Sequence, residues 1–596
     1  MRSKLLRLLP VAAVLLTASC TDKQYDLNDI DTTSRFTANK LIVPLNMDPI
    51  QLDAIISLED DSDVKTDGNG NYYFKKNSTT PFQSKDVKVE KITILKPADI
   101  SENVTLDIAL PAEVMNKIEQ YANDKTIEEI LKEPLRTLVG INENTPIFKI
   151  KLEDEKSFNM NANGIDSHIT RLEKLGFDPL TININIRLDG LKNLVSTVNI
   201  NDLEIDLPCG MTITDNSNYD TTTGKLKYDN MVVTNGQKSI QATVTGLVYD
   251  KMEGDHAKFD AVTHTFAYNK QCKISGEAEV KASDLNGNAK LSTIKDAKNA
   301  NYSCDVKFSN NIVVNSFSGG IIYAIEDINI DPVDISNLPE ILKESGTNIE
   351  LENPQLYLDV TNPFFKNNIT ATAGLSITGN NPIEKNNLVF DKEINKKALS
   401  PKSNKEELFR QDADYELEQF TDLQNILSGD KVPEKLDIKV VNPVLDAKNT
   451  KDFALGVSHP GITGDWEFYT KLSLTEKTRI KYTKEWDDWG SEDLDNLTVE
   501  KATASFIVKK DIALDAESIE FTLLGKTDQL KSKKIALKGD EEQLIVLELE
   551  GNPVKNIYGG KVTVNLNGKG KDLNKTQKLE ISNLRVTVDG YYDKEL

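Results

Sequence analysis

Histidine is the side chain best suited to proton transfer near neutral pH and to zinc binding, and this chain of 596 residues has four. They are His168, His256, His264 and His459, and no two stand at the i, i+4 spacing that places two imidazoles on one helix face. His256 and His264 flank a predicted strand, which favours solvent-facing positions. We therefore expect no metal site and no cofactor.

Motifs for nucleophilic or phosphate chemistry are also missing. Ser458 and His459 lie in the sequence GVSHPG, which lacks the second glycine of a nucleophile elbow at the right place, and Ser292 to Lys295 matches S-x-x-K without its companion motifs. There is no P-loop and no G-x-G-x-x-G turn. Glycosidases need two carboxylates at a set separation, and among 94 acidic residues any choice of pair is arbitrary. The sequence therefore predicts no catalytic residue and favours a non-enzymatic protein.

All three tryptophans fall between positions 466 and 489. Trp466 belongs to an alternating run and is expected in a core, whereas Trp486, Asp487, Asp488 and Trp489 lie in a charged stretch expected to be a loop. Exposed indoles stack on sugar rings while carboxylates bind hydroxyl groups, so these four residues form a candidate ligand-binding site. In the alternative, both indoles fold back onto the end of a sheet.

The cysteines are few and widely spaced. Cys209, Cys272 and Cys304 follow Cys20, and their spacing matches no metal-ligand motif. One disulfide at most is expected among them, with Cys272 to Cys304 as the candidate pair.

The first twenty residues resemble a lipoprotein signal peptide. Basic residues precede an apolar run at 8–16 that is too short to span a hydrocarbon core of about 30 Å, and small residues then lead to Cys20 as in a lipobox. We expect cleavage after residue 19 and lipid on the Cys20 thiol, which anchors the chain to a membrane.

The net charge limits the partners. Lysine and arginine total 71 against 94 acidic residues, and loss of the three basic residues of the signal peptide leaves 68 − 94 = −26. Such a surface repels phosphate backbones, so nucleic acid is not expected as a partner.

Alternation of apolar and polar residues dominates the rest of the chain, as in the run from Ile182 to Leu188. Similar runs occupy 239–248, 273–281, 321–330, 355–361, 435–441, 466–474, 498–508, 543–549, 560–566 and 577–588. The pattern predicts a mainly β protein of tandem antiparallel β-sandwich domains with a few short packing helices.

Helical patterns are limited to 111–135 and to short pieces near 168–175, 336–345 and 420–428, and the sequence from Asp67 to Asn71 predicts a hairpin turn. The predicted division is a signal peptide at 1–19, a lipidated tether and first strand at 20–50, and a β-rich domain with one helix at 51–205. A β-sandwich region at 206–390, a charged linker with short helices at 391–430 and a C-terminal β-sandwich region at 431–596 follow.

The sequence YDLNDIDTT at 25–33, followed by FTANKLIVPLN at 36–46, is similar to the mature start of uncharacterised outer-membrane lipoproteins of Bacteroidota. This resemblance implies an outer-membrane address and a long β-rich body, with no assigned activity. Thr32 and Thr221 each follow an aspartate in three residues that resemble the O-glycosylation sequon of this phylum. Both are candidate modification sites, and the cell surface and the periplasmic face remain open as locations.

Three functions follow as hypotheses. The leading one is a non-enzymatic, lipid-anchored outer-membrane envelope protein that binds a partner protein or glycan. The second is a structural or adhesin subunit that resembles fimbrillins and assembles by strand exchange. The third and weakest is a glycan-directed hydrolase whose carboxylates are hidden among many others.

Overall fold

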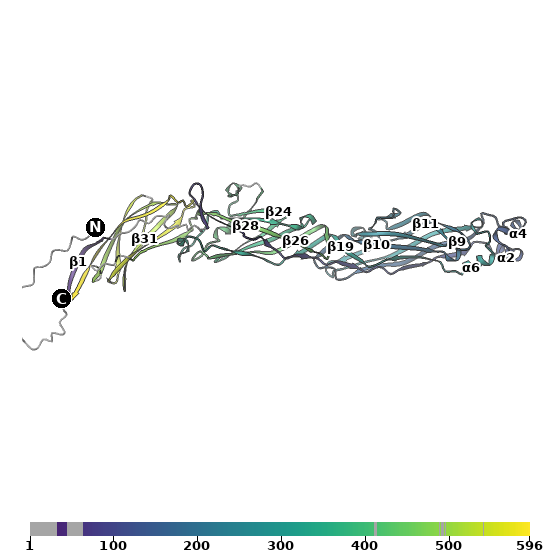
Figure 1. Cartoon of the computed structure of the whole chain (residues 1–596), viewed down its shortest axis with the longest axis horizontal. Coiled ribbons are helices and arrows are strands. Elements are labelled where there is room, and N and C mark those ends of the chain that lie inside the picture. The colour runs from purple at the N-terminus through teal and green to yellow at the C-terminus, as the bar shows by residue number, and fades with distance from the viewer. Residues whose placement is uncertain are drawn as a thin grey trace, which may run out of the picture.

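The computed structural model describes residues 33–44, 63–254, 256–410, 414–487, 489, 494, 496–539 and 541–595. About 59% of the chain is strand and 10% is helix, and its several antiparallel sheets confirm the predicted mainly β class. Figure 1 shows a long rod of three β modules in a row. We call them proximal, middle and distal, the proximal module being the one that contains β1 and β37.

The proximal module is one ten-stranded antiparallel sheet in which the first described strand lies beside the last. β1 pairs with β37 from Thr33 opposite Glu595 to Pro44 opposite Arg585. The strands are β1 (Thr33–Pro44), β29 (Arg479–Trp486), β30 (Leu497–Asp511), β31 (Leu514–Gly525), β32 (Gln529–Ser532), β33 (Ile535–Ala536), β34 (Gln543–Gly551), β35 (Val554–Lys555), β36 (Ile557–Gly568) and β37 (Lys578–Glu595).

The middle module has two layers with the core between them. One layer, sheet B, has the order β2-β3-β28-β21-β24-β25, with β4 beside β28, and the other contains β20, β22, β23 and β26. The elements are β2 (Val64–Thr66), β3 (Tyr72–Asn77), β4 (Phe82–Gln83), β20 (Ile328–Asp334), α7 (Glu340–Lys343), β21 (Gln355–Thr361), η4 (Pro363–Asn367), β22 (Thr370–Thr378), β23 (Pro382–Phe390), β24 (Ile394–Ser400), η5 (Lys405–Glu407), β25 (Glu416–Gln419), η6 (Thr421–Asn425), β26 (Lys435–Ala454), β27 (Ser458–His459) and β28 (Thr463–Lys471).

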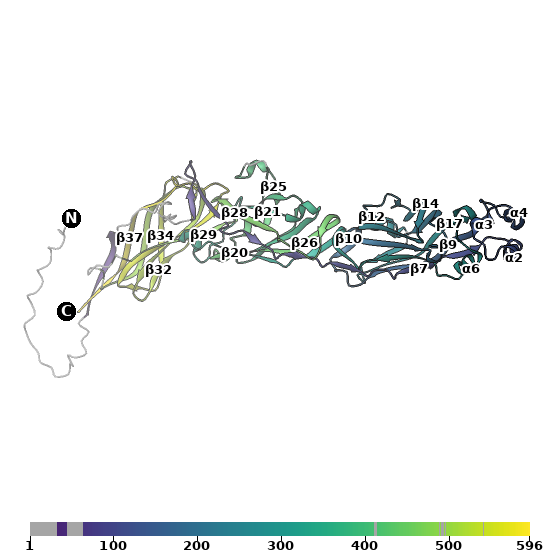
Figure 2. The ribbon, with the colours of Figure 1, turned by 45° about the vertical axis from the view of Figure 1, so that its right-hand side comes forward.

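The distal module contains the longest run of consecutive elements and ends in a group of helices (Figure 2). Its elements are β5 (Val87–Lys88), β6 (Ile92–Ile94), β7 (Ile100–Asn103), β8 (Thr105–Ile108), α2 (Ala112–Tyr121), α3 (Ile127–Ile130), α4 (Leu135–Val139), β9 (Pro146–Ala162), β10 (Ile169–Arg187), η2 (Asp189–Leu191), β11 (Thr197–Asp206), β12 (Met211–Ile213), β13 (Tyr219–Asp220), β14 (Lys225–Thr234), β15 (Gln237–Val248), α5 (Tyr249–Glu253), β16 (Ala257–Asp260), β17 (Thr265–Lys281), η3 (Ala282–Asp284), α6 (Leu291–Lys298), β18 (Ser303–Phe308) and β19 (Ile312–Ala324).

The chain therefore runs out along the rod and returns, so that each module is inserted within the one before it. Among the described residues, pairing crosses the predicted boundaries at 50/51, 205/206, 390/391 and 430/431: β1 with β37, β11 with β17, β21 with β24 and β22 with β26. The modules are consecutive in space and nested in sequence.

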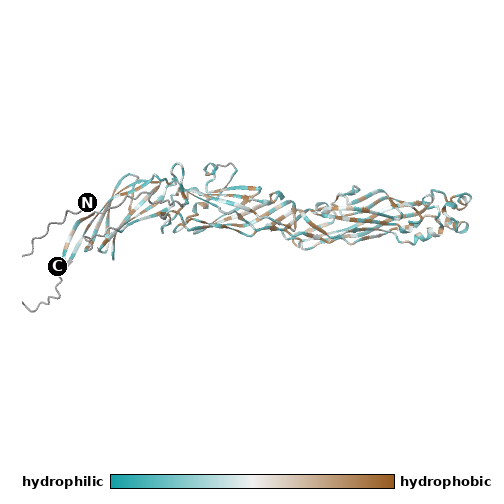
Figure 3. Cartoon of the chain, in the orientation of Figure 1, coloured by the Kyte–Doolittle hydropathy of each residue, from teal (hydrophilic) through white to brown (hydrophobic). Residues whose placement is uncertain are grey.

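Alternation explains why these segments form strands with one buried face. Ile182, Ile184 and Ile186 are fully buried, whereas the intervening Asn183 and Asn185 accept hydrogen bonds from Gln241 Nε2 and Ser239 Oγ on β15. Brown and teal bands alternate in the same way along strands of all three modules (Figure 3).

Two sequence-based predictions are wrong. Residues 168–175 were expected to be helical, but Ile169 begins β10, and register shifts against β19 on either side of Arg171 reset the alternation. Bulges of this kind place Ile169, Leu172 and Leu175 three residues apart, which imitates helical spacing. The charged linker at 391–430 instead contains β24, which lies between β21 and β25 because its lysines pair with acids of the following segment.

Other local predictions are confirmed. The hairpin turn at Asp67 to Asn71 joins β2 and β3, and the 111–135 pattern contains α2 and α3. The pieces near 336–345 and 420–428 contain α7 and η6.

The proximal and middle modules meet where the β2–β3 turn packs against the loop that precedes β37. The backbone N–H of Lys575 donates to Gly70 O at 2.9 Å. Asn574 Nδ2 donates to Asn69 O at 2.9 Å and to Asn71 Oδ1 at 2.8 Å. These bonds connect two modules that are far apart in sequence.

We predict that Asn574→Ala loosens this junction. Loss of the two side-chain hydrogen bonds that cross the junction, at about 1 kcal/mol each, should speed local amide exchange in the peptide covering 66–73 by roughly 5- to 30-fold. Exchange followed by mass spectrometry measures it, and Thr576→Ala, which removes a bond only within the loop, serves as control. Equal protection in Asn574→Ala and the parent would contradict the role of Asn574.

Candidate functional site

The tryptophan pair does not form the exposed site expected from the sequence. Trp489 is only 7% exposed, and its ring stacks on Phe521 with centroids 6.3 Å apart. Gly560 makes room for this indole, because a Cβ there would stand 2.1 Å from the Trp489 ring. Trp486, at the end of β29, also packs against the core. Asp487 is exposed, and Asp488 lies outside the described residues.

The structure also corrects the cysteine pairing. Cys272 lies opposite Lys156 of β9, and Cys304 lies opposite Ile186 of β10. Both cysteines are buried, and within the described chain no disulfide joins them. The predicted Cys272–Cys304 bond is therefore wrong.

The lipid and sugar attachment predictions are not tested. Cys20 and Thr32 lie outside the described residues. Thr221 is exposed in the turn between β13 and β14, where a modifying enzyme could reach it, and it stays a predicted glycosylation site.

A different group of side chains gathers on the outer face of sheet B. Tyr357 and Asp359 of β21 lie opposite Glu467 and Asp465 of β28, and Asn77 of β3 lies opposite Glu467 on its other side. Since residues two apart on a strand share a face, the register places all five together. They line an open cleft of about 220 Å³, which we call the tyrosine–acid cleft.

Described residues between β24 and β25, at 401–410 and 414–415, cover part of this face, and we call them the covering segment. Leu408 and Tyr415 pack on Tyr357, Ala398 and Tyr469 to form a small second core outside the main one. Burial of these rings fixes the segment over the sheet, which places its polar side chains at the cleft.

Arg410 enters the cleft from this covering segment. Its backbone N–H donates to the Tyr357 hydroxyl at 3.0 Å, and its guanidinium Nη1 donates to the Tyr415 hydroxyl. Arg410 Nε lies 3.4 Å from Glu467 Oε1. The arginine thereby joins the covering segment to both strands that line the floor.

The tyrosines remain uncharged near neutral pH. Burial raises the pKa of Tyr357, and burial together with the hydrogen bond to Asp359 raises the pKa of Tyr415. Asp359 Oδ1 and Glu467 Oε1 are enclosed and accept no hydrogen bond from the described residues. Enclosed carboxylate charge is costly, and the nearby guanidinium offsets part of that cost.

Asp465 is the accessible acid of the cleft. It is exposed, and its Oδ1 accepts a hydrogen bond from Ser78 Oγ at 3.1 Å. The cleft thus offers donors and acceptors side by side. Across the described chain no group of three or more His, Cys, Asp or Glu is placed to hold a metal ion.

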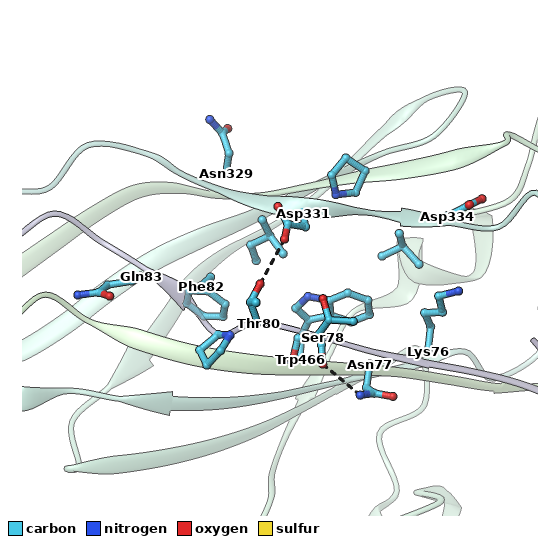
Figure 4. A pocket seen from close by; sticks show the side chains of 15 residues that line it. Lys76, Asn77, Ser78, Thr80, Phe82, Gln83, Asn329, Asp331, Asp334 and Trp466 are labelled. Atoms are coloured by element: carbon cyan, nitrogen blue, oxygen red, sulfur yellow. Dashed lines mark hydrogen bonds between the residues drawn. The ribbon is translucent and has the colours of Figure 1, made fainter.

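A second hollow lies on the other side of the Asn77–Ser78 backbone (Figure 4). This groove of about 280 Å³ runs between residues 76–83 and β20 and has Trp466 in its wall, while Thr80 Oγ1 donates to Asp331 Oδ2 at 3.3 Å across it. Pro332 and the register shift between Ile330 and Val333 make this edge of β20 a poor template for another strand. We therefore do not expect the groove to bind an extended peptide by strand pairing with β20.

Sequence reasoning missed the tyrosine–acid cleft because its members are distant in the chain. Trp466 was correctly expected in a core, and it is 6% exposed. Acids at 465 and 467 alternate with it, which indicated an outward face, but nothing local connected them with Asp359 or Arg410.

Comparison with known proteins assigns no family. No protein-family model and no curated protein sequence matches the chain. A candidate secreted protein from Parabacteroides distasonis is similar over 46% of this chain and 90% of its own, at 15% identity and a TM-score of 0.32. A triple jelly-roll protein of an archaeal virus covers 76% of this chain and 86% of its own, at 8% identity and a TM-score of 0.12.

Likenesses this weak indicate no function. In the described part of the chain, no helix has both the length and the apolarity needed to cross a membrane.

We predict that Glu416→Gln loosens β25 and the covering segment at neutral pH. Hydrogen bonds from Lys392 and Lys397 lower the pKa of Glu416 from 4.5 to about 2, so the carboxylate contributes stability above pH 4.5. That contribution falls away as the pH drops through about 2. For an ion pair this exposed the effect should stay below about 1 kcal/mol.

Amide exchange of the peptide covering 414–419 at matched pH measures this difference. We expect faster exchange in the variant at pH 7 and convergence with the parent near the lower pKa. Glu393→Gln, which removes an exposed pair with Lys366, is the control. A difference that persists unchanged at low pH would refute the assignment.

Proposed function

We propose that the chain is a non-enzymatic envelope protein that is attached to the outer membrane through lipid on Cys20 and binds a partner protein or glycan. The observation that carries this proposal is the pairing of β1 with β37 at one end of the rod, opposite the helices of the distal module (Figures 1 and 2). A lipid near the start of the chain would therefore hold the proximal module and project the other two.

The distances along the chain agree with this arrangement. Thirteen positions separate Cys20 from Thr33, so the connection spans at most about 45 Å at 3.3–3.6 Å per residue. A tether of this length keeps the proximal module near the membrane. The tyrosine–acid cleft lies one module farther along the rod.

One observation favours the fimbrillin-like alternative as a second candidate. β1 is an edge strand and, in the described sheet, pairs only with β37. Phe36 is 56% exposed and Ile42 is 58% exposed, whereas only Val43 of this strand is counted with the buried core. A strand with so little buried apolar surface could be released and replaced by a strand from another copy.

We predict that Cys20→Ala moves the protein from the membrane fraction to the soluble fraction and abolishes labelling by a radioactive fatty acid. Two or more acyl chains anchor firmly, and the described part of the chain offers no spanning helix in their place. Cys209→Ser, which alters a buried thiol, should remain in the membrane fraction. A soluble parent, or a membrane-bound and labelled Cys20→Ala variant, would overturn the proposal.

Cells that express the protein can also show which face of the membrane it occupies and whether it assembles as a fimbrillin-like subunit. An epitope inserted in the turn at 141–144, between α4 and β9, reports surface exposure by antibody binding to intact cells. Laddering on unboiled gels that disappears when Ile42→Cys and Thr587→Cys pin β1 to its opposite position on β37 would favour fibre assembly. Monomer bands from both proteins would exclude it.

A further inference from the structure

We infer that the tyrosine–acid cleft binds a neutral sugar unit of a glycan. This inference rests on the proposed binding function and names the site and the chemical class of its ligand. It also moves the glycan site from the Trp486–Trp489 pair, which packs against the core of the proximal module, to a different module.

The charges around the cleft exclude strongly charged ligands. Asp359, Asp465 and Glu467 line it, so a phosphate, sulfate or uronate would meet three carboxylates. A cation would meet Arg410 between the two tyrosines, and Lys75 already holds Glu467 Oε2 at 2.9 Å. Positively and negatively charged side chains therefore lie close together around one small volume, which favours a ligand without net charge.

The accessible polar groups suit hydroxyl groups, which donate and accept hydrogen bonds at one atom. Asp465 is an exposed acceptor, and Asn77 and Arg410 carry donors along the same rim. Asp359 and Glu467 are more enclosed, so their part is to hold Arg410 in place. Arg410 is in this sense a positioning residue as well as a donor.

An exposed aromatic ring next to the cleft offers the apolar surface that a sugar face needs: Phe409, the residue before Arg410, lies over Tyr469, two positions along β28 from Glu467. Phe409 is 49% exposed, and its ring lies parallel to Tyr469 with centroids 3.6 Å apart. Its backbone N–H donates to Gln355 Oε1 at 2.8 Å, which fixes the residue from below. A ring held in this way loses little conformational entropy when a ligand stacks on it.

The size of the cleft agrees with one saccharide unit. Its volume of about 220 Å³ lies below the range of roughly 300–1,000 Å³ typical of pockets for whole drug-sized ligands. The open mouth leaves the rest of a glycan chain in solvent.

The test uses the mature-length chain carrying Cys20→Ala, which removes the anchor and keeps every module. It is applied to an array of neutral glycans that contain hexoses, deoxyhexoses and N-acetylhexosamines, together with heparin fragments, chitosan oligomers and oligolysine. The strongest neutral glycan is then titrated by calorimetry. We expect binding to neutral glycans and none to the charged probes.

Matched variants locate the binding. Asp465→Asn should weaken affinity by roughly five- to tenfold, since the ligand then bonds to a neutral instead of a charged acceptor, and Asp437→Asn, at an exposed acid of β26, should not. Phe409→Ala should weaken it similarly, while Phe365→Ala, at an equally exposed ring on η4, should not. Unchanged circular dichroism and melting show that the variants are folded.

Several outcomes would overturn the inference: no neutral glycan bound, binding that survives both Asp465→Asn and Phe409→Ala, or a preference for heparin, chitosan or oligolysine. Each is independent of the Cys20 fractionation experiment. A lipid-anchored protein with an inert cleft is thus distinguishable from one that is not anchored.

Discussion

The backbone ladder along β26 is the interaction on which the shape of the molecule depends. One edge of this strand pairs first with β20 in the middle module and then with β19 of the distal module, without a loop between them. The two modules therefore share one sheet. Because the backbone hydrogen bonds continue along the strand from one module to the next, the modules cannot rotate freely relative to each other. Phe453, fully buried near the end of β26, packs on Phe317 of β19 and adds side-chain contacts to the same junction.

Local alternation made the strands predictable, and non-local pairing made their arrangement unpredictable. Ile182 to Ile186 alternate strictly and form a strand with one buried face, as expected from period two alone. The apolar spacing at Ile169, Leu172 and Leu175 failed as a guide because bulges change the period within a real strand. The nested order of modules leaves no local trace, since it depends on pairing of β1 with a strand more than 500 residues away.

The candidate site shows the same contrast between local patterns, which could be predicted, and long-range arrangement, which could not. The outward direction of Asp465 and Glu467 follows from their alternation with Trp466, so the face was predictable. The cleft was not, because its other side comes from β21 and from Arg410 in a segment whose lysines and glutamates resembled a linker. The prediction that Trp489 is exposed was wrong. Its charged neighbours indicated a loop, but the space left by Gly560 admits the indole into the core.

The second core outside sheet B explains how a polar cleft persists on a narrow rod. A flat sheet face of tyrosines and carboxylates would be solvated on every side and would hold no ligand in a fixed geometry. Burial of Leu408 and Tyr415 against Tyr357 and Tyr469 fixes the covering segment, and the segment in turn presents Arg410 at the rim and holds Phe409 over Tyr469. The enclosed carboxylate oxygens of Asp359 and Glu467 lower the stability of this region. Apolar side chains at these two positions would pack without that cost. Such unfavourable polar burial beside an open hollow agrees with the binding role that we propose for the cleft.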